Sequence, residues 1–181
     1  MNRRWIIAAL ALTPAAIVLP VHAVVYMSAE QARGALYPQA ARFDEVSFEP
    51  SAAQQQALEQ ALGNAGKPRR VRGWTAYDAA GKLLGTVYID DVIGKYELIT
   101  YAVAFGAGGE VQAVEILAYR ESHGQEIRLP AWRKQFVGRK SLDELRFGDQ
   151  IKSISGATLS CRHVTEGVQR LAVLRGLTPA R

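Results

Sequence analysis

Two helices are predicted in the first third of the chain by their polar starts and apolar periodicity. Each start has a serine three residues before a glutamine, the spacing of a capping box: Ser28 with Gln31, and Ser51 with Gln54. The first helix is expected to reach about Leu36, because Pro38 cannot continue it. The second is expected to end at the glycine-containing stretch 63–66, and its apolar residues recur at helical spacing: Ala53, Ala57, Leu58, Ala61 and Leu62.

Alternating apolar and polar residues predict five strands, at 43–48, 71–77, 83–89, 96–105 and 111–119. Short turn-forming stretches join the last four of them in pairs, at 78–82 and at 106–109. Four successive strands joined by tight turns favour an antiparallel meander over βαβ units.

The C-terminal third returns to helical patterning. A half-helical segment is expected at 125–137, with Pro130 near its start, and a last helix from about Leu159 to Leu174. The last helix carries an apolar stripe that can pack on the sheet: Val164, Val168, Leu171 and Leu174. The pattern therefore predicts an α+β fold, an antiparallel sheet meander packed by helices.

The N-terminus has the three parts of a secretory signal peptide: Arg3 and Arg4, an uncharged run from Trp5 to Pro20, and the small-residue cleavage pattern Val21-His22-Ala23. This divides the chain into a signal peptide at 1–23 and one domain at 24–181, exported to the periplasm or cell envelope. An uncleaved membrane anchor is the alternative. A spanning helix needs about 20 apolar residues, whereas this stretch is interrupted by Pro14, Pro20 and His22.

Composition limits the possible functions. The chain has 181 residues, of which 49% are hydrophobic and 22% charged, as expected for one globular domain. The net charge of +5 would suit nucleic acid, a membrane surface or an acidic partner, but export argues against nucleic acid. The single cysteine, Cys161, excludes an intramolecular disulfide, and three scattered histidines do not suggest a metal site. No established catalytic motif is present, so no catalytic residue is predicted.

One segment carries candidate chemistry, the hydroxyl-rich stretch Ser153 to Ser160 just before the last helix. Gly156 and Ala157 leave the backbone accessible to a bulky group. Hydroxyl groups lie where a helix presents unpaired amide groups and the positive end of its dipole, which suits a phosphate. The alternative is an ordinary loop that caps a helix.

The sequence Ser155-Gly156-Ala157-Thr158, followed by Leu159 and Ser160, resembles the flavin-attachment motif of the FMN-binding domain family. Further segments resemble the family in consistent order between positions 26 and 174: Tyr26 to Pro38, Gly94 to Tyr101, Glu121-Ser122-His123-Gly124, and the stretch from Trp132 to Gly138. The family occurs in flavin subunits of the sodium-pumping NADH:quinone reductase and of Rnf-type complexes, and in small exported proteins.

The resemblance implies an FMN cofactor bound through a phosphoester to Thr158 and installed from FAD by a flavin transferase with magnesium. It also implies which residues bind the cofactor beside Thr158: Ser155, Gly156, Ala157, Leu159, Glu121, His123 and Gly124. The function implied is an electron-transfer carrier with a membrane-bound redox partner, rather than a substrate-specific enzyme. A redox-sensing or assembly module that binds FMN without passing electrons on, and a small flavin reductase, remain alternatives.

The chain departs from the family at one position. Family members usually have an acidic residue three positions before the motif serine, where this chain has Lys152. Non-covalent FMN is therefore the alternative to a covalent bond. Trp132 and Phe136 could stack on the flavin ring, although packing in the core is favoured. A buried, unreactive Cys161 is likewise the favoured interpretation.

Overall fold

The computed structural model describes residues 24–67 and 70–177, so the predicted signal peptide lies outside the described residues. Its centre is an antiparallel six-stranded sheet in the order β1-β6-β5-β4-β3-β2. The strands are β1 (Val24–Val25), β2 (Arg42–Phe48), β3 (Val71–Tyr77), β4 (Leu83–Ile93), β5 (Leu98–Gly106) and β6 (Val111–Tyr119). The meander predicted from the sequence is confirmed.

Within residues 24–67 and 70–177, four α-helices and three short 3-10 helices accompany the sheet. They are α1 (Ala29–Leu36), α2 (Ala52–Leu62), η1 (Gly63–Gly66), η2 (Gln125–Arg128), α3 (Pro130–Arg133), η3 (Lys134–Phe136) and α4 (Thr158–Leu177). Both predicted capping boxes are present, at the starts of α1 and α2. None of the helices in the described part of the chain is long and apolar enough to cross a membrane.

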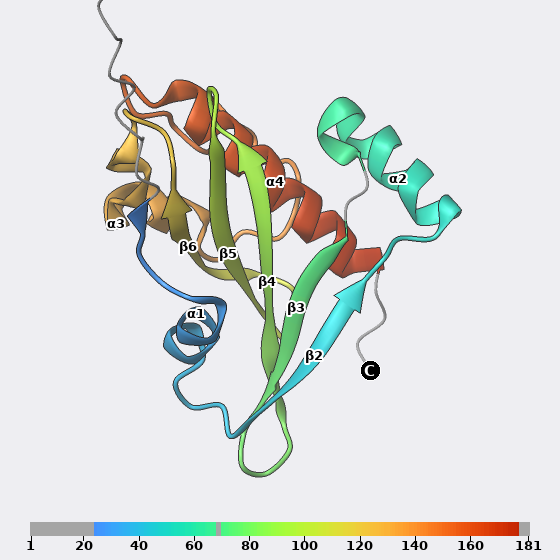
Figure 1. Ribbon diagram of the computed structural model, residues 1–181. Helices are drawn as coiled ribbons and strands as arrows, with labels where there is room; N and C mark the ends of the chain where they lie inside the picture. Colours follow the sequence, from blue (N-terminus) through green and yellow to red (C-terminus); the bar gives the residue numbers. More distant parts are fainter. Residues whose placement is uncertain (1–23, 68–69, 178–181) are drawn as a thin grey trace, which may run out of the picture.

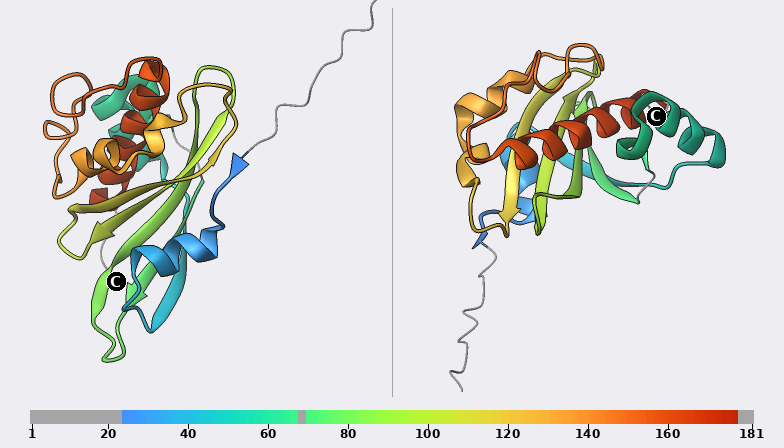
Figure 2. Two further views of the ribbon diagram at one scale, coloured as in Figure 1. Left: turned by 90° about the vertical axis from the view of Figure 1, so that its left-hand side faces the viewer. Right: turned by 90° about the horizontal axis from the view of Figure 1, so that it is seen from above.

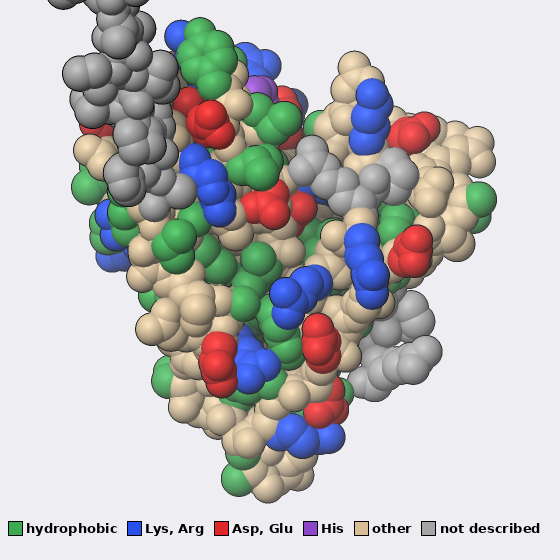
Figure 3. Space-filling model, in the orientation of Figure 1, with side chains coloured by type: hydrophobic (Ala, Val, Ile, Leu, Met, Phe, Trp, Pro, Cys, Tyr) green, Lys and Arg blue, Asp and Glu red, His purple; other side chains and the backbone are tan. Residues whose placement is uncertain are grey.

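The long helix α4 and the short helix α1 cover opposite faces of the sheet (Figures 1 and 2). Alternate residues of β5 point to the two sides, as a pleated strand requires. Tyr101, Val103 and Phe105 join the larger core beneath α4, whereas Ala102 and Ala104 join a smaller core beneath α1. On the edge strand β2 and its neighbour β3, opposite charges lie side by side (Figure 3), including the ion pair of Arg42 with Asp44 at 2.9 Å.

Two strand boundaries differ from the sequence prediction by more than one residue, and one short strand was not predicted. The strand β4 continues four residues beyond 89 because its two aspartates, which disfavour strands, both have partners. Asp91 accepts a hydrogen bond from Thr100 at 2.5 Å, and Asp90 meets Arg170 of α4. The strand β5 starts at Leu98 rather than Tyr96, since residues 94–97 form the turn between β4 and β5. The two-residue strand β1 is too short to show any alternation in sequence.

The helix α4 packs so closely on the sheet at Gly167 that alanine would clash there, although alanine is the better helix former. A Cβ atom there would lie 2.1 Å from the Tyr101 hydroxyl oxygen. We expect Gly167→Ala to lower the free energy of unfolding by about 1–3 kcal/mol through overpacking. At Gly176 of the same helix, a Cβ atom would meet nothing within 4 Å, so Gly176→Ala should instead raise the free energy of unfolding by up to about 1 kcal/mol. Urea denaturation of both variants measures the difference, and equal effects would contradict it.

Candidate functional site

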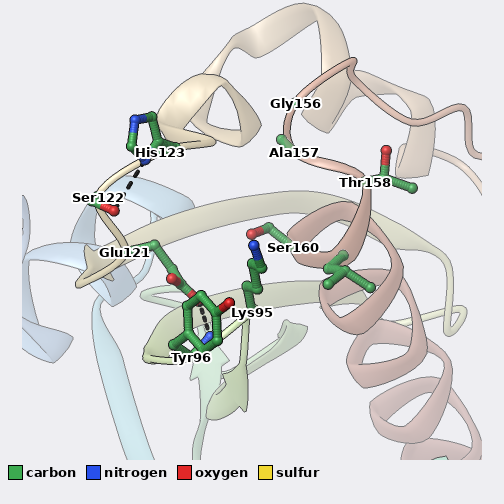
Figure 4. A pocket seen from close by; sticks show the side chains of 10 residues that line it. Lys95, Tyr96, Glu121, Ser122, His123, Gly156, Ala157, Thr158 and Ser160 are labelled. Atoms are coloured by element: carbon green, nitrogen blue, oxygen red, sulfur yellow. Dashed lines mark hydrogen bonds between the residues drawn. The ribbon is translucent and has the colours of Figure 1, made fainter.

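A pocket of about 370 Å³ lies where three segments meet: the β4–β5 turn, the loop after β6 and the first turn of α4 (Figure 4). Its lining residues are Lys95, Tyr96, Glu121, Ser122, His123, Gly156, Ala157, Thr158, Leu159 and Ser160. The volume is within the range of about 300–1,000 Å³ usual for small-molecule and cofactor sites. Segments far apart in the sequence therefore form one site.

The start of α4 is shaped by a tight turn over residues 154–157. The amide of Ala157 donates to the carbonyl of Ile154 at 3.0 Å, and Gly156 has a φ of 82°. A positive φ at the third residue of such a turn is the reason for glycine there. After this turn, the amides of Thr158, Leu159 and Ser160 have no acceptor within the described residues, because the first helical bond runs from Cys161 to Ala157 at 2.9 Å.

Tyr119 ties the loop after β6 to the start of α4. Its hydroxyl donates to the carbonyl of His123 at 2.6 Å and accepts from the Ser160 hydroxyl at 3.1 Å. Burial raises the pKa of the Tyr119 phenol above its usual value, so the group stays a donor. Gly124, with a φ of 91°, fits against this hydroxyl, since a Cβ there would lie 2.6 Å from it and 3.2 Å from the Ala157 Cβ. The two pocket walls are thus fixed to each other.

Six of the predicted site residues line the pocket together: Glu121, His123, Gly156, Ala157, Thr158 and Leu159. The remaining two are adjacent but do not line it. Ser155 is exposed in the turn, and Gly124 is buried behind the pocket wall. The role of all eight in holding a cofactor stays a prediction.

Lys95 and Tyr96 were not predicted as site residues. The strand predicted from the sequence begins at Tyr96, directly after Lys95, and only Gly94 before them signals a tight turn. In the structure they form the tip of the β4–β5 hairpin, with the Lys95 ammonium 4.8 Å from the centre of the Tyr96 ring. Figure 4 shows both side chains at the edge of the pocket, near Glu121 and Ser160.

Trp132 and Phe136 are core residues, as the sequence analysis favoured. Both are buried, with ring centres 5.1 Å apart and edge to face, and neither lines the pocket. The Trp132 indole donates to the carbonyl of Lys152 at 2.8 Å, which fixes the extended stretch before the α4 turn. Cys161 is also fully buried, and burial raises the pKa of its thiol.

The pocket combines groups that suit an anionic, partly aromatic molecule. Three free amides and the exposed Thr158 hydroxyl lie at the N-terminus of a 20-residue helix, which favours a phosphate. Tyr96 and Leu159 are 75% and 43% exposed and offer apolar surface for a flat ring. No group of three or more His, Cys, Asp or Glu side chains within 24–67 and 70–177 is arranged to hold a metal ion. The residues present therefore fit a flavin phosphate.

Comparison with known proteins gives two matches. A family model of the FMN-binding domain matches residues 94–173, which run from the β4–β5 turn to the last turns of α4. The crystal structure of NqrC from Shewanella oneidensis matches with a TM-score of 0.47 and 18% sequence identity, over 84% of this chain and 79% of that chain. No curated protein sequence matches the chain.

Proposed function

Since residues 94–173 belong to the FMN-binding domain family, we propose that this protein is an exported electron carrier that holds FMN through a phosphoester on Thr158. The observation that carries the proposal is the position of Thr158. It is the first residue of α4, it is exposed, and it lines the pocket together with the free amides of the helix start.

Covalent attachment to Thr158 is consistent with the charge of this site. Transfer from FAD forms a bond between the Thr158 oxygen and the FMN phosphorus, breaks the pyrophosphate bond of FAD, and releases AMP with the hydroxyl proton. The phosphodiester keeps one negative charge, which the N-terminus of α4 stabilises. Lys152 is exposed, and its ammonium donates to the carbonyl of Gly148 at 2.8 Å, outside the pocket lining. A transferase that meets an acidic residue in other family members would meet this lysine here.

An electron carrier is the role that the pocket supports best. The bound flavin supplies reversible electron transfer, and the protein supplies attachment, charge and limited access to water. The pocket opens beside the exposed hairpin tip, so a redox partner can approach the cofactor directly. A tethered cofactor also suits an exported carrier, because free FMN would be lost from the envelope.

We expect membranes supplied with their physiological electron donor to reduce the purified flavoprotein, and a separate acceptor protein to reoxidise it. Absorbance of the oxidised flavin measures both steps. The same protein with Thr158→Ala, lacking covalent flavin, is the control for membrane-derived absorbance changes. Turnover of a small substrate by the isolated protein, without membranes, would favour the reductase alternative. Flavin that stays oxidised with every donor membrane would favour a sensor or assembly module.

We also propose export by the leader at 1–23. The cleavage pattern Val21-His22-Ala23 predicts Val24 as the first residue of the mature chain, and Val24 pairs with Tyr119 of β6. N-terminal sequencing of protein from the envelope fraction is therefore expected to begin at Val24. Full-length protein recovered only from membranes would support the anchor alternative instead.

A further inference from the structure

We infer that Glu121 and His163 are positioning residues that hold the tip of the β4–β5 hairpin beside the pocket, so that Tyr96 and Lys95 contact the bound flavin. The inference rests on the proposed function for the identity of the ligand. It assigns to Glu121 a role through the hairpin backbone rather than through the cofactor.

Glu121 binds the hairpin tip by its backbone. One carboxylate oxygen, Oε1, accepts from the amide of Tyr96 at 2.6 Å and from the amide of Glu97 at 3.0 Å. The same oxygen would lie 2.6 Å from a Cβ atom at position 94, so only Gly94 lets the turn approach this closely. Figure 4 shows the Glu121 side chain reaching from the loop after β6 to the Tyr96 backbone.

His163 of α4 binds the same hairpin through its carbonyl groups. Its Nδ1 lies 2.6 Å from the carbonyl oxygen of Ile93 and 2.9 Å from that of Gly94. Both neighbours are acceptors, so Nδ1 carries the hydrogen and donates. His163 belongs to the second turn of α4, directly after the turn that bears Thr158. Two side chains from two other elements thus fix four backbone groups within residues 93–97.

The hairpin tip has little support of its own. Its described backbone closure is one hydrogen bond, from the amide of Gly94 to the carbonyl of Glu97 at 2.8 Å. Lys95, Tyr96 and Glu97 are all exposed, with Tyr96 at 75%. A tip with so few contacts would move without the two side chains that bind it. What it holds in place is an aromatic ring with an ammonium group 4.8 Å from its centre.

The side chains of Tyr96 and Lys95 suit the chemistry of a flavin. The Tyr96 ring can stack on the flat isoalloxazine system, and the Lys95 ammonium can bind its carbonyl oxygens or the negative charge that reduction adds. A tyrosine stacked on a flavin also quenches flavin fluorescence, because the phenol donates an electron to the excited ring. The fluorescence of bound flavin therefore reports the position of the tip.

The first experiment measures hydrogen–deuterium exchange of the Tyr96 and Glu97 amides in the full chain prepared without flavin. Glu121→Ala is expected to speed exchange of both by about tenfold or more, the loss expected for a hydrogen bond to a charged group. Glu121→Gln keeps an acceptor oxygen without the charge, so it should speed exchange less than Glu121→Ala does. His163→Leu should likewise speed exchange, and His163→Asn, which keeps a donor, should not. Wild-type exchange in both Glu121→Ala and His163→Leu would overturn the inference.

The second experiment measures fluorescence of the flavin-loaded protein at matched flavin content. Tyr96→Leu is expected to raise it severalfold without changing amide exchange, and Glu121→Ala to raise it by loosening the tip. Tyr77→Leu, at the far end of β3, is the matched control and should leave the flavin fluorescence unchanged.

Two outcomes would count against the inference. If Glu121→Gln raises the fluorescence as much as Glu121→Ala does, the charge of Glu121 acts on the cofactor, which overturns the positioning role. A wild-type protein that takes up no flavin would overturn the proposed function and the Tyr96 contact, while amide exchange would still decide how the hairpin is held.

Discussion

Thr158→Ala is expected to abolish covalent flavin completely. Wild-type protein produced with a flavin transferase should keep flavin fluorescence after denaturation, and its intact mass should exceed that of the chain by FMN less one water. The alanine variant should show neither, because its side chain has no oxygen to form the phosphoester. Folding should survive, because Thr158 is exposed and alanine is the better helix former at the first residue of α4. The comparison uses the soluble, folded fraction of both proteins.

Neighbouring hydroxyls provide the controls for this experiment. Ser155 is exposed in the turn, whereas Ser160 is buried and bound to Tyr119. Ser155→Ala and Ser160→Ala should both retain covalent flavin. Retention in Thr158→Ala, with loss in one of the serine variants, would move the attachment site to that serine. Lys152→Asp restores an acidic residue and should speed labelling. No covalent flavin in wild type or Lys152→Asp, with an active transferase, would leave FMN bound non-covalently.

The capping boxes and the strand alternation could be predicted because both are local signals. Ser28 and Gln31 interact within one helical turn, and the side chains of a half-buried strand alternate along its own sequence. The last helix was predicted as well, from about Leu159, because its apolar stripe is also a local signal. These features account for the sheet and for the helices that cover it, whereas the pocket residues 156–159 were named from the resemblance of their motif.

Lys95 and Tyr96 could not be predicted as pocket residues, because the side chains that bind their hairpin are distant in sequence. Tyr96 and Lys95 become pocket residues only when Glu121 and His163 hold the turn, at separations of 25 and about 70 residues. The end of β4 was missed for the same reason. Asp90 and Asp91 argue against a strand by propensity. The partners that offset this lie elsewhere in the chain: Arg170 and Tyr101 for Asp90, and Thr100 for Asp91.

That buried pair gives the largest expected effect on stability. Asp90 and Arg170 form an ion pair whose side chains are each 5% exposed. Tyr101 donates to the same Asp90 oxygen at 2.9 Å, and Arg170 donates to the carbonyl of Ala65 at 3.3 Å, so the pair joins β4, β5, η1 and α4. Arg170→Met would leave a buried carboxylate without its cation. We expect it to lower the free energy of unfolding by about 3–5 kcal/mol, a large share of the roughly 5–15 kcal/mol of a typical domain.

Guanidinium denaturation measures this loss, with Arg146→Met as the control. Arg146 and Asp149 are 57% and 68% exposed and 3.8 Å apart, so breaking that pair should change stability by no more than about 1 kcal/mol. The double variant Asp90→Leu with Arg170→Met removes both charges. Its loss of unfolding free energy should be smaller than the two single losses added together, which is the signature of a coupled pair. A loss below about 1 kcal/mol for Arg170→Met would contradict the network.

The same variants should still accept flavin in their folded fraction. Arg170 lies twelve residues along α4 from Thr158, about 18 Å at 1.5 Å per residue. A variant that loses stability and keeps its flavin would separate the support of α4 from the chemistry at its N-terminus.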